Sequence, residues 1–78
     1  MRPRQLRLIV SFHTTTAAMA MERYCLENAV PGRLIPIPRE ITAGCGMAWS
    51  APPEEKDAVL RASGQGEIEI AGTYVLEI

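Results

Sequence analysis

The sequence predicts an α+β fold with one antiparallel sheet, and three observations lead to this fold class. The chain has 78 residues, of which 47% are hydrophobic, so we expect a single domain over residues 1–78 rather than disorder. No internal repeat or low-complexity segment interrupts it. Strand-like and helix-like segments follow one another in the order β-α-β-β-α-β. The commonest compact form of that order is the ferredoxin-like sandwich, in which two helices cover one face of the sheet.

The first strand and the first helix have the clearest patterns. Between Gln5 and Phe12 the even-numbered residues are all apolar, which predicts a strand with that face on the core. We expect Thr14 to cap the following helix, because its hydroxyl can accept a hydrogen bond from a free backbone N–H. The helix should reach about Ala29 and stop before Pro31, since proline cannot continue it. Its expected apolar stripe comprises Ala18, Met21, Cys25 and Ala29.

Prolines limit what the next segment can form. Residues 33–37 are extended, but Pro36 and Pro38 restrict them to an edge strand or an irregular one. Residues 38–44 are expected to form a loop. The run GMAWS, residues 46–50, predicts a short third strand.

The second helix and the last strand complete the predicted order. Residues 51–55 are typical of a helix start, because proline is tolerated in the first turn and acidic side chains favour the positive end of the helix dipole. The helix is expected to fade near Gly64. Apolar side chains then keep even numbers through residues 68–78, which favours one long strand kinked at Gly72. A hairpin that turns at Ala71 and Gly72 is the alternative.

This connectivity brings a cysteine to the start of the first helix. The first strand ends, and the first helix begins, at the same end of the sheet as the loop of residues 38–44. The third strand then descends from Cys45. We therefore expect Cys45, Arg39, His13 and Thr14 to share one end of the domain, although they are far apart in the sequence.

A thiol in that position is expected to be reactive. A helix N-terminus has roughly half a positive charge and free N–H donors, and a nearby arginine adds to both effects, so the nucleophilic thiolate is favoured. Glycines on both sides leave room for N–H donors and a partner's sulfur to approach. The alternative, a tight turn that contains an inert cysteine, stays open. The predicted site comprises Cys45 as the catalytic residue and Arg39, His13, Thr14, Gly44 and Gly46 as groups that stabilise an anion or a sulfur.

The other candidate residues point to no cofactor and no metal. Cys25 falls on the apolar stripe of the helix and is interpreted as core, because a buried cysteine behaves as a small hydrophobic residue. His13 is either a base or, as is commoner for a histidine beside threonines, a structural hydrogen-bonding group. Together with Cys45 these residues are too few for a structural zinc site, and the sequence has no CxxC and no P-loop.

Charge and hydropathy argue against two kinds of partner. The formal net charge of −1 disfavours nucleic-acid binding by phosphate neutralisation. No apolar run approaches the ~20 residues of a membrane-spanning helix, and the short run at residues 8–10 is no signal peptide. We therefore expect a cytoplasmic protein with reduced cysteines. So small a core would gain from a homodimer, which the sequence permits but does not require.

The segment of residues 12–55 contains a distinctive motif. A threonine-rich turn opens an amphipathic helix, and the stretch IPxPRxIxAGCGxA follows. The stretch is made up of Ile35, Pro36, Pro38, Arg39, Ile41, Ala43, Gly44, Cys45, Gly46 and Ala48. In these features the chain resembles a small bacterial family of selenium/sulfur carrier-like proteins. The resemblance implies that Cys45 takes up sulfur or selenium as a persulfide or selenosulfide, with donor and acceptor proteins as partners.

Two functions of different classes follow. In the first, Cys45 accepts sulfur or selenium from a donor protein and passes it to an acceptor. In the second, the domain is a non-catalytic small-ligand or protein-interaction module, with Cys45 as a turn residue and a ligand notch at His13, Thr14 and Arg39. A thiol–disulfide protein ranks below both, since its only internal resolving partner is Cys25, which is expected in the core.

Overall fold

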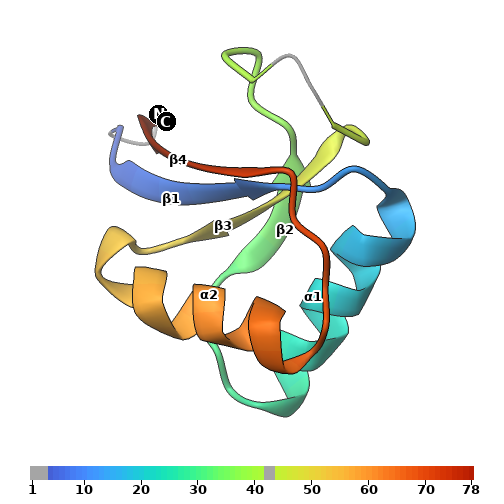
Figure 1. Ribbon diagram of the computed structural model, residues 1–78. Helices are drawn as coiled ribbons and strands as arrows, with labels where there is room; N and C mark the ends of the chain where they lie inside the picture. The colour runs from blue at the N-terminus through green and yellow to red at the C-terminus, as the bar shows by residue number, and fades with distance from the viewer. Residues whose placement is uncertain (1–3, 42–43) are drawn as a thin grey trace.

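The computed structural model describes residues 4–41 and 44–78, and within them a four-stranded antiparallel sheet carries both helices on one face (Figure 1). The strand order is β2-β3-β1-β4. The elements are β1 (Leu6–Ser11), α1 (Thr15–Glu27), β2 (Arg33–Pro36), β3 (Met47–Ala51), the 3₁₀ turn η1 (Pro53–Glu55), α2 (Lys56–Gln65) and β4 (Gly72–Glu77). Apart from η1 this is the predicted order, and the ferredoxin-like α+β class is confirmed.

The main core lies between the sheet and the helices. Leu8 and Val10 of β1 and Trp49 of β3 meet Met21 of α1 and Val59 of α2. Each of these side chains is at most 1% exposed. Burying a side chain of this size contributes about 1.5–3 kcal/mol, so the even face of β1 and the stripe of α1 hold the two layers together.

The opposite face of the sheet is also partly covered, which the alternation of β1 did not indicate. Ile9, an odd-numbered residue of β1, is fully buried in a second cluster with Ala48 and Ile41. Half-buried Ile35 and Ile37 pack against this cluster. The chain after β2 thus folds back over the open face, and the same loop leads on to the candidate site.

Helix α1 begins where the sequence predicts and ends earlier. The Thr14 hydroxyl oxygen accepts a hydrogen bond from the Ala17 N–H at 3.1 Å, so the predicted cap is confirmed. The last member of the predicted stripe, Ala29, is exposed, whereas the other three are buried. Ala29 adopts a left-handed conformation with a φ of 55°, and the Val30 N–H then donates to the Cys25 carbonyl at 2.9 Å. This terminal turn closes the helix before it can reach Ala29.

Strands β2 and β3 form a hairpin, and the described residues just before β3, residues 44–46, are called the cysteine loop because they contain Cys45. β2 is an edge strand, as its prolines predict, and it ends at Pro36 rather than at Ile37. The Ile37 N–H still donates to the Gly46 carbonyl at 2.9 Å, so the two sides of the loop are joined just beyond the strands.

The last strand is shorter than predicted, and no hairpin replaces it. Ile68 and Ile70 pack against the main core, whereas Leu76 packs against the cluster on the opposite face. The even-numbered residues therefore do not share one face, and the expectation of one strand from residue 68 is wrong. The chain joins the sheet only where the Ala71 N–H donates to the Ser11 carbonyl at 2.7 Å, and β4 starts at the next residue.

Candidate functional site

Cys45 lies beside the start of α1. Its backbone N–H donates to the Phe12 carbonyl at 3.0 Å, and Phe12 is the residue that follows β1. Thr14 caps α1 two residues later. The end of β1, the helix cap and the cysteine loop therefore meet at one end of the sheet (Figure 1). Chain connectivity and one backbone hydrogen bond bring these distant parts of the sequence together.

The two glycines that flank Cys45 are required by different features of the structure. Both have positive φ angles, 123° at Gly44 and 93° at Gly46. A Cβ on Gly44 would lie 3.0 Å from the Phe12 carbonyl oxygen and 3.3 Å from the Ile37 Cδ1, whereas a Cβ on Gly46 would have nothing within 4 Å. Gly44 is thus required by the close approach of the loop to β1. Gly46 is required by the turn alone, and it leaves open space next to Cys45.

The Cys45 side chain is half-buried. It packs against the main core, and its Sγ lies 3.8 Å from the Met47 carbonyl oxygen, to which the S–H can donate. Cys45 is a free cysteine. Its thiol is therefore in contact with both the protein interior and the surface.

The second cysteine is in a different environment. Cys25 is 1% exposed and belongs to the main core, so its interpretation as a core residue is confirmed. Desolvation by this burial raises the pKa of the Cys25 thiol from its usual 9.0 to about 11. Cys25 therefore stays protonated and shielded near neutral pH, and it is the natural reference for the behaviour of Cys45.

The predicted partners of Cys45 lie on exposed turns. His13 directly precedes the helix cap, and Arg39 lies in the turn that follows β2, with both side chains exposed. The Thr14 hydroxyl already serves as an acceptor in the cap. In the part of the chain that the structure describes, no side-chain hydrogen bond or ion pair joins His13 or Arg39 to Cys45. The backbone places these segments near the cysteine loop, and the roles of the two side chains remain predictions.

One family model covers most of the chain. The model, described as "Putative Se/S carrier protein-like", matches residues 7–75. The chain belongs to this family. The match includes the cysteine loop, although Ala43 of the motif lies outside the described residues. No curated protein and no solved structure matches the chain.

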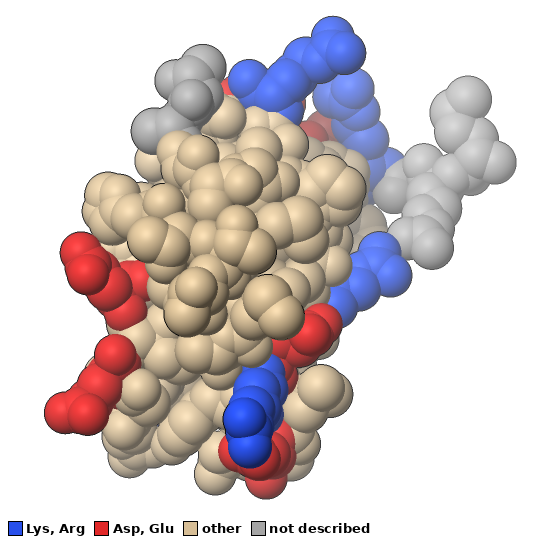
Figure 2. All heavy atoms as spheres, turned by 90° about the vertical axis from the view of Figure 1, so that its right-hand side faces the viewer, with Lys and Arg blue, Asp and Glu red and all other residues tan. Residues whose placement is uncertain are grey.

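In this member of the Se/S carrier-like family, the surface on the α1 side has few charges at its centre. Figure 2 shows a broad central area without Lys, Arg, Asp or Glu, with acidic side chains at the left, basic ones at the top, and charges of both signs at the right and the bottom. Residues 12–17, at the start of α1, and residues 44–49, which include Cys45 and the start of β3, contain no Lys, Arg, Asp or Glu. Neither segment therefore places one of these four residue types beside Cys45 in the sequence.

Within residues 4–41 and 44–78, no group of three or more His, Cys, Asp or Glu side chains could hold a metal ion. No helix in these ranges is both long and apolar enough to cross a membrane.

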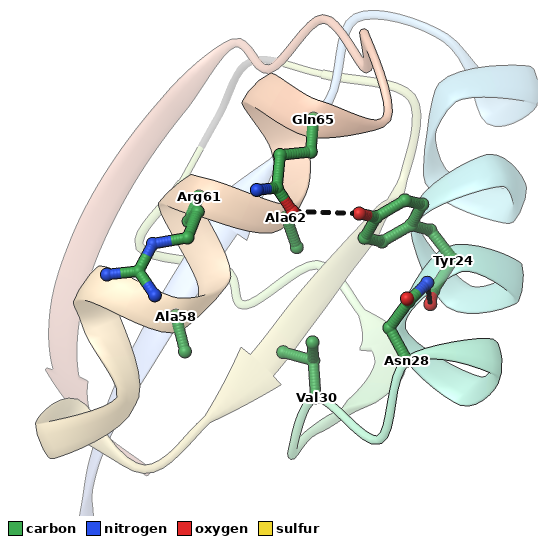
Figure 3. A pocket seen from close by; sticks show the side chains of 7 residues that line it. All are labelled: Tyr24, Asn28, Val30, Ala58, Arg61, Ala62 and Gln65. Atoms are coloured by element: carbon green, nitrogen blue, oxygen red, sulfur yellow. Dashed lines mark hydrogen bonds between the residues drawn. The ribbon is translucent and has the colours of Figure 1, made fainter.

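A hollow of about 230 Å³ lies between α1 and α2, and the sequence did not indicate it (Figure 3). Tyr24 and Asn28 line it from the end of α1, Arg61 and Gln65 from α2, and Val30 from the turn between. The Tyr24 hydroxyl donates to the Gln65 Oε1 at 3.0 Å and so links the two helices. The hollow is at the opposite end of α1 from the cysteine loop. Only the packing of the helices brings its residues together, so no motif marks it.

Proposed function

We propose that this protein carries sulfur or selenium, as a persulfide or selenosulfide, on Cys45. One observation supports this above all. Of the two cysteines, the glycine-flanked Cys45 lies half-exposed beside the start of α1, whereas Cys25 is sealed in the core. Membership in a family described as Se/S carrier-like supplies the class of cargo.

The proposed transfer is an exchange between sulfur atoms. The Cys45 thiolate attacks the outer sulfur of a persulfide on a donor protein. A bond forms between the Cys45 Sγ and that sulfur, the S–S bond of the donor breaks, and the donor leaves as a thiolate. The cargo leaves Cys45 in the same way when the thiolate of an acceptor attacks it. No net oxidation occurs, so the step needs no cofactor.

The local structure supports this step in two ways. The free N–H groups and the positive end of α1 favour an anionic sulfur in their neighbourhood. A Cβ on Gly46 would meet no atom within 4 Å, so this side of Cys45 leaves space for a second chalcogen atom. We propose that the exposed Arg39 and His13 contact this anionic outer atom.

The partners and location proposed here follow from the chemistry. A reducing cytoplasm would keep Cys45 as a free thiol between transfers. Donor and acceptor proteins would dock around it, and the uncharged residues on both sides of Cys45 suit the centre of a protein interface, where charged residues are depleted.

Intact-mass measurement after transfer from a persulfide donor tests the proposal. Wild-type protein should gain the mass of one sulfur atom, and a reductant should remove it. Cys45→Ser should gain none, whereas Cys25→Ala should load like wild type because Cys25 is buried. Arg39→Ala should load more slowly if the guanidinium stabilises the anionic product. Equal loading of Cys45→Ser and wild type would refute the carrier function.

A non-catalytic ligand or interaction module is the second candidate. The packing of Cys45 against the core and its 3.8 Å contact with the Met47 carbonyl favour a structural cysteine. Alkylation with iodoacetamide separates the two functions. A carrier requires native Cys45 to react faster than a cysteine in a short unstructured peptide at the same pH, and the module predicts an equal or slower rate.

A further inference from the structure

The two edge strands of the sheet differ in how they are protected. β2 has four residues and contains both Arg33 and Pro36. β4 has six residues and contains neither proline nor lysine, its one charged residue is Glu77 at its end, and its register with β1 is unbroken from Gly72 to Glu77. No other described strand pairs with its outer side. Proteins usually protect an edge with prolines, lysines or bulges, because an open edge is a template for another strand.

The same edge exposes apolar side chains. Val75 is 51% exposed and Tyr74 is 39% exposed, and both lie in β4. Leu6 on the adjoining strand is 58% exposed, and Ile78 just after β4 is 38% exposed. These are four of the six large apolar side chains that are exposed in the described part of the chain. The unprotected edge is therefore also the place where exposed apolar surface gathers.

The hydrogen-bond ladder shows which backbone groups of β4 are free. Gln5 and Ile78 exchange both of their backbone hydrogen bonds, at 2.9 and 3.0 Å. Bonded and non-bonded pairs alternate along antiparallel strands, so the even-numbered residues of β4 direct their N–H and C=O groups at β1. Thr73, Val75 and Glu77 therefore direct theirs away from the sheet, to the open side.

We propose that a second copy of this chain covers this edge, with the two β4 strands antiparallel and Val75 opposite the partner's Val75. A two-fold axis through this position, perpendicular to the sheet, also places Thr73 opposite the partner's Glu77. All three outward-facing residues then fall in bonded pairs, with two N–H···O bonds in each pair. If the axis passed through residue 74 or residue 76 instead, one of the three outward-facing residues would have no opposite residue in the partner's β4.

The side chains suit the same register. Val75 lies opposite Leu8 of β1, so its side chain is on the helix side of the sheet, where the two copies of Val75 would meet at the axis. On the other face, Tyr74 would lie opposite the partner's Leu76. Glu77 would lie opposite a threonine, so no like charges oppose each other.

A second copy fits this edge better than an unrelated strand because the strand is complementary to itself. Pairing about a two-fold axis uses both open edges at once and closes the assembly. The two β1 strands then run in opposite directions, so the two cysteine loops lie at opposite ends of the extended sheet. The interface would leave both Cys45 sites accessible.

Sedimentation equilibrium over a dilution series tests the dimer. Wild-type protein should be a dimer that dissociates on dilution. Val75→Lys places like charges opposite each other and removes apolar contact, so the dissociation constant should rise at least about tenfold. Met19→Lys is the matched control and should leave the dissociation constant unchanged. Met19 is 61% exposed on α1, which packs mainly against β3 and α2, and β1 separates β3 from β4 in the sheet.

Crosslinking tests the register independently of any effect of lysine on folding. In a Cys45→Ser background, Val75→Cys should form a disulfide between copies under mild oxidation, since Cα atoms in a bonded pair are about 5.5 Å apart, within disulfide range. Thr73→Cys is the control. Its copies would be four residues out of register, about 14 Å apart along the strand, and should not crosslink.

Three results would overturn the dimer. These are a monomer at every concentration of wild type, a Val75→Lys dissociation constant equal to that of wild type, and equal crosslinking of the Val75→Cys and Thr73→Cys variants. If the wild type is a monomer, the strand that covers the β4 edge would have to come from a different protein.

Discussion

The substitution Gly44→Ala tests whether close packing of the cysteine loop on β1 shapes the site. Gly44 has a φ of 123°, and an added Cβ would lie 3.0 Å from the Phe12 carbonyl oxygen. That oxygen already accepts the hydrogen bond of the Cys45 N–H at 3.0 Å. The new methyl group would therefore strain the backbone and push the loop away from the bond that positions Cys45.

The size of the effect can be worked from these contacts. A residue with a Cβ in this sparsely populated region costs about 1–3 kcal/mol. Weakening the Cys45 to Phe12 hydrogen bond adds about 0.5–1.5 kcal/mol. The lower entropy of alanine in the unfolded chain offsets about 0.4–1 kcal/mol. We expect Gly44→Ala to lower the free energy of unfolding by about 2 kcal/mol.

Gly46→Ala is the matched control. Gly46 also has a positive φ, 93°, but a Cβ there would meet no atom within 4 Å. It should show the backbone cost alone, about 1 kcal/mol after the entropic offset. Urea unfolding followed by the fluorescence of Trp49 measures both variants, because Trp49 is the single tryptophan and is 1% exposed. If Gly44→Ala is no less stable than Gly46→Ala, the close approach to β1 is not what requires Gly44.

Two further predictions concern α1. Because burial raises the pKa of Cys25 from 9.0 to about 11, the unfolded chain releases this proton first, and the free energy of unfolding should fall as the pH rises from about 9 to 11. Urea titrations at several pH values should show a shallower decline for Cys25→Ala, and an identical decline would contradict the assignment. Thr14→Ala should lower the free energy of unfolding by about 1 kcal/mol through loss of the cap, while Thr14→Ser should keep most of it. Equal stabilities of the two Thr14 variants would show that the hydroxyl does not contribute.

Local rules predicted the elements that depend on neighbouring residues in the chain. The sequence predicted Thr14 as a cap because a hydroxyl just before an alanine-rich run commonly accepts a hydrogen bond from a free N–H of the first helical turn. Pro36 marked β2 as an edge strand because proline cannot donate to a second neighbour. The even-numbered apolar residues of β1 indicated the main core because side chains alternate between the faces of a strand.

The errors lie where distant contacts override the local pattern. The sequence of β1 did not predict that the face bearing Ile9 is buried, because the residues that cover it, Ile37 and Ile41, belong to a later loop. Residues 68 to 78 kept an even pattern, yet the hydrogen bond from Ala71 to Ser11 sets where the strand starts. The alternation depends only on the sequence of residues 68–78, whereas the start of β4 depends on where β1 can form hydrogen bonds with it.

By itself, the sequence determined the order of the elements, the cap of α1, the edge position of β2 and the presence of a cysteine between two glycines. These follow from preferences that act over a few residues. Tertiary structure alone decided that Gly44 packs on Phe12, that Cys25 is buried while Cys45 reaches the surface, and that no described strand pairs with the outer side of β4, where Val75 is exposed. Each of these depends on which strands become neighbours, and the pairing of strands is set by the burial and hydrogen bonding of the whole sheet.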